Sequence, residues 1–228
     1  MCILSLNSCK NNLTLSEQYQ KLKPAFGWHP EQKLISDHDL VELLEWMKNH
    51  KDEMTAVGEV GLPYYVRQES TRNPFPLAGY LEVLEQFIAV AKKWDKPIIL
   101  HAVYDDAPLV CDLLERYSLP HIHFHWFKGD AKTISRMRDN GYYISVTPDI
   151  VYKERSRDLI KDYPIDRILV ETDGPWPFEG PFNGKKTHPS MIHHSIKMIA
   201  TIKRLPLFSV YRQLFDNTKQ LYRLNISH

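Results

Sequence analysis

The chain has 228 residues, of which 43% are hydrophobic and 25% charged, a composition typical of a globular protein with one sizeable core. The 29 basic and 28 acidic side chains leave a net charge of +1, so overall charge does not predict a nucleic-acid partner. Three scattered cysteines exclude a disulfide framework, and no apolar run has the length of a membrane span. We therefore expect a single domain over residues 1–228, a cytoplasmic location, and neither a membrane nor an obligate protein partner.

Short apolar runs alternate with amphipathic stretches along the chain. Most of the runs are nearly continuous in apolar or β-branched residues, which is typical of strands buried on both faces of a parallel sheet. The stretches between them carry apolar residues at helical spacing, and Ser36 is a candidate cap for one such helix. The predicted strands are Cys2–Leu6, Pro24–Trp28, Thr55–Leu62, Pro97–Val103, His121–Phe127, Tyr142–Pro148 and Arg167–Asp173. The other predicted helices are Leu77–Ala91, Asp105–Tyr117, Ala131–Asn140, Pro189–Arg204 and Leu207–Leu224.

The alternation of strands and helices favours a parallel α/β fold, for which two architectures compete. A doubly wound sheet would carry a glycine-rich phosphate turn after its first strand, but Leu6 is followed by Asn-Ser-Cys-Lys. A TIM barrel places functional residues at the C-terminal ends of several strands, as this chain does. We predict a TIM-barrel (β/α) fold with seven strands present and the first strand of the barrel missing.

Four of the predicted strands carry, near their ends, side chains that commonly bind metal ions. These residues are Glu59, His101, His125 and Asp173. Each of them alone is better explained as a core or turn residue, whereas their joint occurrence at strand ends favours a functional site. Two carboxylates and two imidazoles suit a divalent ion such as zinc or manganese. Such an ion lowers the pKa of bound water and polarises a phosphoryl or carbonyl oxygen.

Five short segments of the sequence are distinctive, and they follow one another in a specific order. The first two are Gly27–Pro30, which reads Gly-Trp-His-Pro, and Gly58–Tyr65, which reads Gly-Glu-Val-Gly-Leu-Pro-Tyr-Tyr. The third, Pro97–His101, is a proline-led strand that ends in histidine. The last two are His125–Gly129, which reads His-Trp-Phe-Lys-Gly, and Glu171–Pro175, which reads Glu-Thr-Asp-Gly-Pro. Together with Asn217 near the C-terminal end, these segments resemble the motifs of the TatD family of metal-dependent hydrolases, which are amidohydrolase-like TIM barrels. The resemblance covers essentially the whole chain.

The resemblance implies a hydrolase of phosphodiester bonds with two divalent metal ions, which zinc, manganese or magnesium could supply. Glu59 would bridge the ions, and His101 and His125 would hold one of them. Asp173 would hold the other ion and accept a proton from the attacking water, so that Glu59 and Asp173 are the expected catalytic residues. DNA and tRNA are the expected substrates. The residues expected to contact the substrate are His29, Tyr65, Trp126, Lys128 and Trp176.

Three features of the sequence depart from the family pattern. The family begins with a strand that ends in His-x-His and completes the metal position of Asp173, and no such motif precedes Glu59 here. Two residues after the strand histidine, where the family has an arginine, this chain has Val103. At the aspartate position of the family's Gly-Leu-Asp-Tyr motif it has Pro63. His123 shares a strand face with His125, and we interpret it as a core residue rather than a replacement ligand.

Three functions are therefore compatible with the sequence. The first is a TatD-like deoxyribonuclease that cleaves phosphodiester bonds with metal-activated water. The second is an amidohydrolase-type enzyme that cleaves another ester or an amide, including the bond of a D-aminoacyl-tRNA, because the same ligands serve that chemistry. The third is an inactive scaffold that lacks its N-terminal strand.

Overall fold

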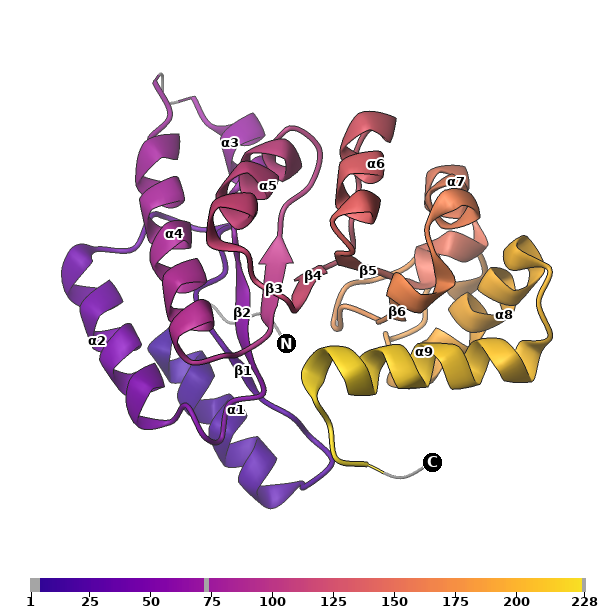
Figure 1. Ribbon diagram of the computed structural model, residues 1–228, viewed down its shortest axis with the longest axis horizontal. Coiled ribbons are helices and arrows are strands. Elements are labelled where there is room, and N and C mark those ends of the chain that lie inside the picture. The colour runs from indigo at the N-terminus through magenta and orange to yellow at the C-terminus, as the bar shows by residue number, and fades with distance from the viewer. Residues whose placement is uncertain (1–4, 72–73, 227–228) are drawn as a thin grey trace. The chain divides into compact units, whose positions relative to one another are not determined.

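The computed structural model of the chain describes residues 5–71 and 74–226 (Figure 1). The chain divides into two compact units, Cys2–Ile122 and His123–His228, which we call the N-terminal unit and the C-terminal unit. The strand pairings described within the two units are all parallel. The structure therefore confirms the predicted parallel α/β class.

The N-terminal unit contains three parallel strands in the order β1-β2-β3. The strands are β1 (Ala25–Phe26), β2 (Ala56–Gly61) and β3 (Ile98–His101). Figure 1 shows two of the helices, α2 and α4, on the same side of β2. The helices are α1 (Leu6–Gln18), α2 (Asp37–Asn49), α3 (Tyr64–Glu69), α4 (Leu77–Lys93) and α5 (Asp106–Tyr117).

Helices α2 and α4 lie where the spacing of apolar residues predicted helices. Ser36 caps α2, since its hydroxyl oxygen accepts a hydrogen bond from the backbone N–H of Asp39 at 3.1 Å. Each helix buries one apolar face, and burial of a large apolar side chain contributes about 1.5–3 kcal/mol. The buried residues are Leu40, Leu43 and Met47 in α2, and Tyr80, Leu84, Phe87, Ile88 and Ala91 in α4.

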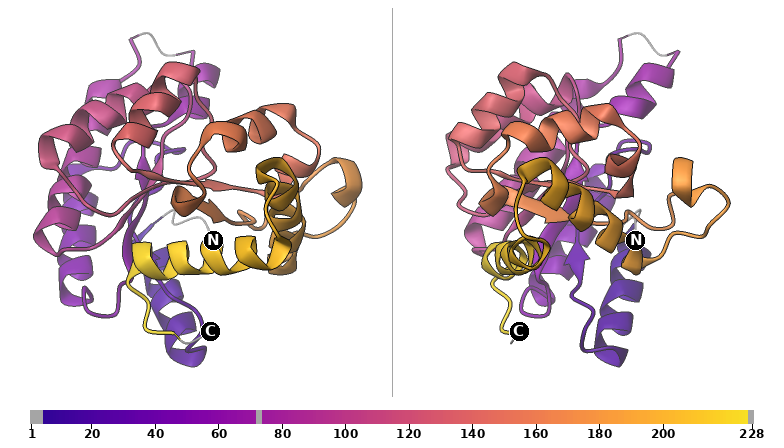
Figure 2. Two further views of the ribbon diagram at one scale, coloured as in Figure 1. Left: turned by 45° about the vertical axis from the view of Figure 1, so that its right-hand side comes forward. Right: turned by 90° about the vertical axis from the view of Figure 1, so that its right-hand side faces the viewer.

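The C-terminal unit contains the remaining strands, which follow the order β4-β5-β6. They are β4 (Ile122–Phe124), β5 (Tyr143–Val146) and β6 (Ile168–Val170). The helices are α6 (Ala131–Asp139), α7 (Glu154–Asp162), α8 (Ile192–Lys203) and α9 (Leu207–Tyr222), with short 3-10 turns at Pro148–Val151, Ile165–Arg167, Gly180–Phe182 and Pro189–Met191. Figure 2 shows α8 and α9 packed at a steep angle to each other.

Asn217 fixes α9 against β6. Its side chain is buried, and its Nδ2 donates hydrogen bonds to the carbonyl oxygens of Ile165 at 2.8 Å and Ile168 at 2.7 Å. These bonds satisfy two backbone carbonyls, and the one of Ile168 is buried, where an unpaired carbonyl would destabilise the fold. The asparagine that the sequence singled out near the C-terminal end therefore has a structural function.

Six of the seven predicted strands contain a strand of the structure. The other prediction, Cys2–Leu6, falls partly on residues 2–4, which lie outside the described residues, and Leu6 is the first residue of helix α1. The hydroxyl oxygen of Ser5 accepts a hydrogen bond from the backbone N–H of Ser8 at 3.3 Å. Helix α1 was not predicted, and this N-cap is the local reason why the chain turns helical at Leu6.

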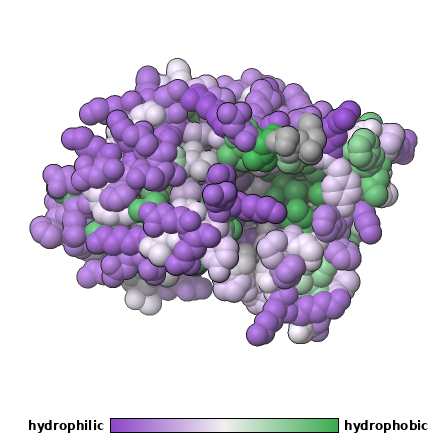
Figure 3. All heavy atoms as spheres, turned by 90° about the horizontal axis from the view of Figure 1, so that it is seen from below, coloured by the Kyte–Doolittle hydropathy of each residue, from purple (hydrophilic) through white to green (hydrophobic). Residues whose placement is uncertain are grey.

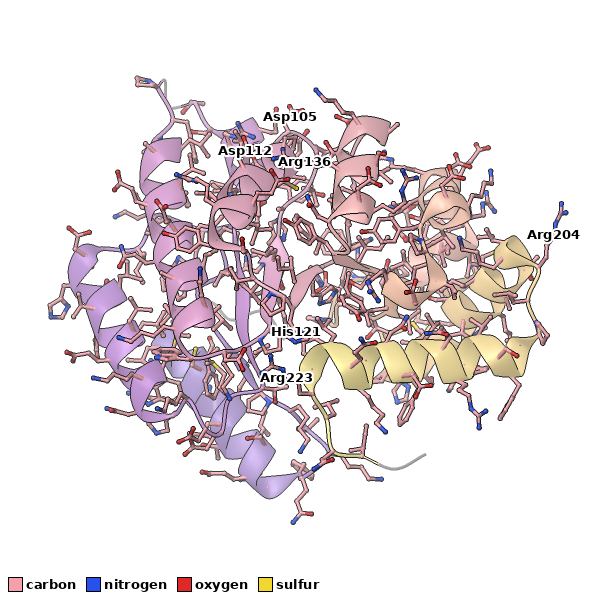
Figure 4. The ribbon with its side chains drawn as sticks, in the orientation of Figure 1. Asp105, Asp112, His121, Arg136, Arg204 and Arg223 are labelled. Atoms are coloured by element: carbon pink, nitrogen blue, oxygen red, sulfur yellow. The ribbon has the colours of Figure 1, made fainter. Side chains whose placement is uncertain are left out.

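Hydrophilic side chains make up most of the face of the molecule drawn in Figure 3. Arg204 ends α8 with a left-handed backbone (φ of 53°) and points away from the ribbon in Figure 4. Three large apolar side chains follow it and are exposed, Leu205 in the turn and Leu207 and Phe208 at the start of α9. Among the described helices, none is both long and apolar enough to cross a membrane.

Candidate metal centre

Glu59 and His101, two of the predicted metal ligands, lie together in the N-terminal unit. Glu59 is in β2 and His101 ends β3, and the Nδ1 atom of His101 is 3.2 Å from the Oε1 atom of Glu59. His29, which follows β1, places its Nε2 atom 3.4 Å from the same oxygen. One atom from each side chain lies within 4.8 Å of the others, a spacing compatible with contact to one metal ion.

Glycines on β2 bring Glu59 close to β3. A Cβ atom on Gly61 would lie 1.9 Å from the carbonyl oxygen of His101, and a Cβ atom on Gly58 would lie 2.6 Å from the Cβ of Ile99. Both approaches are too close for any larger residue. The Gly-Glu-Val-Gly segment therefore allows β2 and β3 to approach so closely that Glu59 and His101 face one another.

The ring nitrogens of His29 and His101 differ in the groups that they face. The Nδ1 atom of His29 accepts a hydrogen bond from the backbone N–H of Glu31 at 3.2 Å, so a neutral His29 carries its proton on Nε2. A protonated nitrogen directed at Glu59 is a hydrogen-bond donor and not a metal ligand. In this tautomer His29 is a hydrogen-bond donor to Glu59, and the distances among His29, Glu59 and His101 also allow contact to one ion.

Glu31 was not predicted from the sequence, and it contacts His101 directly. Its Oε1 atom lies 2.9 Å from the Nε2 atom of His101, and its two oxygens accept hydrogen bonds from the backbone N–H groups of Tyr65 at 2.9 Å and Val66 at 2.8 Å. Glu31 therefore joins His101 to the first turn of α3. The predicted substrate residue Tyr65 is brought near the ligands in this way, with its ring 6.2 Å from that of His101.

Carboxylates on both sides determine the charge state of His101. Burial alone would lower the pKa of His101, but hydrogen bonds and charge from Glu31 and Glu59 outweigh burial and raise the pKa. Burial would likewise raise the pKa of Glu31, but the hydrogen bonds from His101, Val66 and Tyr65 lower it. Glu31 is thus held as a carboxylate, which can only accept hydrogen bonds.

The positions that depart from the family motifs lie near a buried charge pair. Pro63 precedes α3, and Val103 is a buried apolar residue after β3. The guanidinium of Arg67 on α3 contacts the carboxylate of Asp106, the first residue of α5. Burial raises the pKa of Asp106 to about 6, although the charge of Arg67 opposes the shift. The pair joins α3 to α5, and Glu31 contacts the same helix α3.

His125 and Asp173, the other two predicted ligands, lie together in the C-terminal unit. His125 follows β4, and its Nε2 atom is 3.7 Å from the Oδ1 atom of Asp173, which follows β6. Its Nδ1 atom lies 2.5 Å from the Oε2 atom of Glu171. Asp173 and Trp126 both have left-handed backbones, with φ of 41° and 37°. Non-glycine residues rarely adopt this conformation, and such residues are concentrated at functional sites.

Glu171 is the hydrogen-bonding centre of this group. Besides His125, it accepts hydrogen bonds at Oε1 from the backbone N–H of Trp126 at 2.8 Å and from the hydroxyl of Ser145 at 2.5 Å. Burial would raise the pKa of Glu171, but the charge and hydrogen bond of His125 hold it below its usual value. The sequence held one signal for this role, since residues two apart on a strand point to the same side and Glu171 stands two before Asp173.

Two predicted substrate residues, Lys128 and Trp176, lie beside the indole ring of a third, Trp126, in the C-terminal unit. The Nζ atom of Lys128 lies 4.0 Å from the centre of the Trp126 ring, and the Trp176 ring lies 5.5 Å from it. The Nε1–H of Trp126 donates to Asp149 at 3.1 Å, which fixes the ring. Trp176 is 53% exposed and can therefore stack on a ligand. Burial lowers the pKa of Lys128 to about 8.

The structure thus brings the four predicted ligands together as two pairs, Glu59 with His101 and His125 with Asp173, one in each unit. In both pairs the histidine uses its other ring nitrogen to contact a carboxylate, Glu31 for His101 and Glu171 for His125. Metal-binding histidines in proteins commonly have this second partner, which sets the ring orientation and the tautomer.

Comparison with known proteins shows the family to which the chain belongs. Residues 1–223 match the model of the TatD related DNase family. A metal-dependent hydrolase of Haemophilus influenzae is 38% identical over 96% of this chain and 86% of its own length. Human deoxyribonuclease TATDN3 is 28% identical over 92% of this chain and 78% of its own length.

Solved structures confirm the predicted TIM-barrel class. The crystal structure of YjjV, a TatD homologue from Escherichia coli, has a TM-score of 0.86 and 26% identity, and the match covers 98% of this chain and 85% of that chain. A TatD family hydrolase from Entamoeba histolytica shares the fold with a TM-score of 0.80 at 21% identity, over 97% of this chain and 83% of its own. With a family model that matches nearly all of its residues, the chain belongs to the TatD-related DNase family of metal-dependent hydrolases.

Proposed function

We propose that this protein is a divalent-metal-dependent hydrolase of phosphodiester bonds, a TatD-like deoxyribonuclease, and that Glu59, His101, His125 and Asp173 are its metal ligands. The observation that carries the proposal is the placement of the ring nitrogens of the two histidines. His101 turns Nε2 to a carboxylate and directs Nδ1 toward Glu59, and His125 turns Nδ1 to a carboxylate and directs Nε2 toward Asp173. A divalent cation would displace the proton from the nitrogen that faces Glu59 or Asp173, and that nitrogen would then offer its lone pair to the cation.

The donor atoms fit a divalent cation. Imidazole nitrogens and carboxylate oxygens together suit zinc and manganese, and the carboxylates also suit magnesium. A bound divalent ion lowers the pKa of a water ligand and stabilises charge on a phosphoryl oxygen. Glu31 is occupied by three hydrogen bonds, and we therefore assign the cation near His101 to Glu59.

The other residues supply orientation and proton transfer. Asp173 would accept a proton from the attacking water at its carboxylate, since an ionised carboxylate has the acceptor capacity for this role. His29 would donate the proton on Nε2 to a phosphate oxygen or to Glu59. Lys128 would contact a phosphate, and the exposed ring of Trp176 would stack on a base. A stacking ring beside an ammonium group favours a nucleic-acid strand over a small amide or lactone.

Metal removal tests the proposal. Protein treated with a chelator is expected to lose hydrolysis of labelled single-stranded DNA and to regain it when zinc, manganese or magnesium is restored. The same assay is run on duplex DNA, a D-aminoacyl-tRNA and a panel of lactones and amides. DNA cleavage that persists after chelation would refute metal dependence. Turnover of the panel without DNA cleavage would instead identify an amidohydrolase of another ester or amide.

The pH dependence of DNA binding tests the role of Lys128. Because its pKa is about 8, the ammonium group is charged below that pH and is lost as the pH rises through it. We expect KM for single-stranded DNA to rise up to about tenfold between about pH 7 and about pH 9, since one charged contact contributes about 1.4 kcal/mol. Lys128→Arg stays charged over this range and should keep KM flat. Lys132→Arg, an exposed lysine of α6, is the control and should keep the wild-type profile. Identical profiles for wild type and Lys128→Arg would exclude the contact.

A further inference from the structure

The connection between β6 and α8 carries two adjacent lysines on the surface of the C-terminal unit. We call residues 174–191 the basic loop, and Figure 2 shows it in orange where it projects from that unit. Lys185 and Lys186 are both exposed, and Glu179 is the one acidic residue in this stretch of the sequence. The net charge of +1 for the whole chain is therefore compatible with a locally basic surface.

The basic loop is held in place by contacts along its length. Three of its side chains are buried in one cluster, namely Phe178, Phe182 and Met191. The backbone N–H of Glu179 donates a hydrogen bond to the hydroxyl oxygen of Tyr152 at 3.1 Å. The backbone N–H of Lys185 donates to the carbonyl oxygen of Phe182 at 2.9 Å. A loop that is ordered before binding loses less conformational entropy when a ligand binds, so the two lysines are presented on a preorganised backbone.

Thr187 brings the two lysines next to Trp176, the exposed ring of the candidate site. The hydroxyl of Thr187 donates a hydrogen bond to the carbonyl oxygen of Trp176. Consecutive Cα atoms are about 3.8 Å apart, so Lys186 is one such step from this contact and Lys185 is two. The backbone N–H of Trp176 donates to the carbonyl oxygen of Asp173 at 2.9 Å. A continuous stretch of contacts thus leads from Asp173, past the Trp176 ring, to the lysines.

Further cations of the C-terminal unit lie near Trp126, whose ring is 5.5 Å from that of Trp176. Burial is the main cause of the lowered pKa of Lys128, and the charges of Lys153 and Arg155 lower it further, although the charge of Asp149 opposes them. These three cations are therefore close enough to repel one another. Such a concentration of positive charge attracts a partner with several negative charges.

The combination of cations with aromatic rings indicates which polyanion fits. Exposed lysines are common on protein surfaces and do not mark a site by themselves. Here the lysine pair adjoins an exposed tryptophan, which is 53% exposed and follows a proposed metal ligand by three residues. Proteins that bind single strands without reading their sequence combine these two features, because phosphates contact the cations while bases stack on the rings. An acidic peptide would satisfy the charges and leave the ring without a planar partner.

We propose that Lys185 and Lys186 form a further contact site for a single-stranded nucleic acid, in which their ammonium groups bind backbone phosphates beyond the nucleotide that stacks on Trp176. The proposal rests on the proposed function, since the strand is the substrate that is cleaved at the metal centre. It also defines the substrate class more narrowly: the enzyme favours strands of several nucleotides over a dinucleotide, which is too short to reach the lysines as well.

The salt dependence of binding tests the phosphate contacts, because each contact releases counterions from the nucleic acid. A labelled oligothymidylate of about 12 nucleotides is titrated with protein in the presence of a chelator, and its fluorescence anisotropy is followed from about 0.05 to about 0.5 M salt. In the double variant Lys185→Ala/Lys186→Ala, the slope of log affinity against log salt should be smaller by about 1.4, or about 0.7 for each phosphate. Binding at about 0.05 M salt should be at least about tenfold weaker.

Three further variants separate the phosphate contacts from stacking and from overall charge. Lys92→Ala/Lys93→Ala removes an adjacent pair of exposed lysines at the end of α4 and should match the wild type. Lys185→Arg/Lys186→Arg retains both charges and should keep the wild-type slope. Trp176→Ala should weaken binding by about 5- to 150-fold at every salt concentration and leave the slope unchanged, since stacking releases no counterions.

Strand length provides a second readout. The wild type should bind the oligothymidylate more tightly than a labelled thymidine dinucleotide at low salt. The variant Lys185→Ala/Lys186→Ala should lose most of this difference, because its additional phosphates no longer have partners. With metal restored, the same change is expected in KM for hydrolysis of the two substrates.

Three results would overturn the proposal. The first is a Lys185→Ala/Lys186→Ala protein with the wild-type slope, and the second is an equal loss in Lys92→Ala/Lys93→Ala. The third is a polyglutamate peptide that binds as tightly as the strand, since the loop would then recognise charge alone. In each case, DNA cleavage by the wild type would leave the proposed function intact. If the slopes are as expected but the wild type cleaves no DNA after metal is restored, the proposed function fails and the lysines remain a nucleic-acid contact.

Discussion

Replacing Glu59 with glutamine is expected to remove bound metal beside His101 and to lower the rate of DNA hydrolysis by about a thousandfold or more. The substitution preserves the shape of the side chain but removes the negative charge from the oxygen that His101 Nδ1 faces at 3.2 Å. The other nearby carboxylate, Glu31, is bound to two backbone N–H groups and to His101, so it is not positioned to replace Glu59. A thousandfold loss corresponds to about 4 kcal/mol, within what a metal ion supplies to a charged transition state.

The measurement combines metal content by elemental analysis with turnover of single-stranded DNA. Glu53→Gln is the matched control, because it makes the same chemical change at an exposed residue just before β2. The control should bind metal and cleave DNA like the wild type. A Glu59→Gln protein with full metal content and undiminished turnover would show that Glu59 is not a ligand.

Replacing Asp173 with asparagine should lower turnover by about 10²- to 10⁴-fold, the range for loss of a general acid or base. The amide cannot accept the proton of an attacking water as a carboxylate does. Asparagine tolerates the left-handed backbone of residue 173, where φ is 41°, so we expect the fold to persist. The exposed Asp166→Asn variant, which also lies in the C-terminal unit, is the control.

Single-turnover cleavage measures the chemical step of Asp173→Asn, and thermal unfolding measures whether its fold is intact. A slow variant with an unchanged melting temperature supports the role of Asp173 in proton transfer and metal binding. Wild-type turnover by Asp173→Asn would refute that role. Slow turnover accompanied by unfolding would instead assign Asp173 to the stability of the loop after β6.

The strand-end positions of the predicted ligands could be predicted from the sequence because parallel strands place their C-terminal ends on one side. Apolar runs located β2 and β3, and the residue types then indicated Glu59 and His101. The same reasoning located His125 and Asp173 after β4 and β6. The pairing of Glu59 with His101, and of His125 with Asp173, depends on the register between strands. The sequence pattern does not define that register closely enough to predict the pairs.

The partners of the histidines could not be predicted, because they depend on contacts between residues far apart in the chain. Glu31 reaches His101 across 70 positions, and Tyr222 reaches His123 across 99. No local spacing encodes such contacts. The start of α1 at Leu6 was missed for a different reason, since a short apolar run is equally compatible with a strand or a helix and the Ser5 cap decides between them.

Anomalous X-ray scattering from crystals grown with zinc tests the central claim most directly. We expect zinc about 2.0–2.2 Å from His101 Nδ1 and from a carboxylate oxygen of Glu59, and zinc at the same distance from His125 Nε2 and from Asp173. Glu31 and Glu171 should stay on the far nitrogens of the two histidines. Two results would contradict this assignment of the ligands. One is protein that cleaves DNA but has no zinc at any of the four residues, and the other is zinc bound through His101 Nε2 with Glu31 displaced.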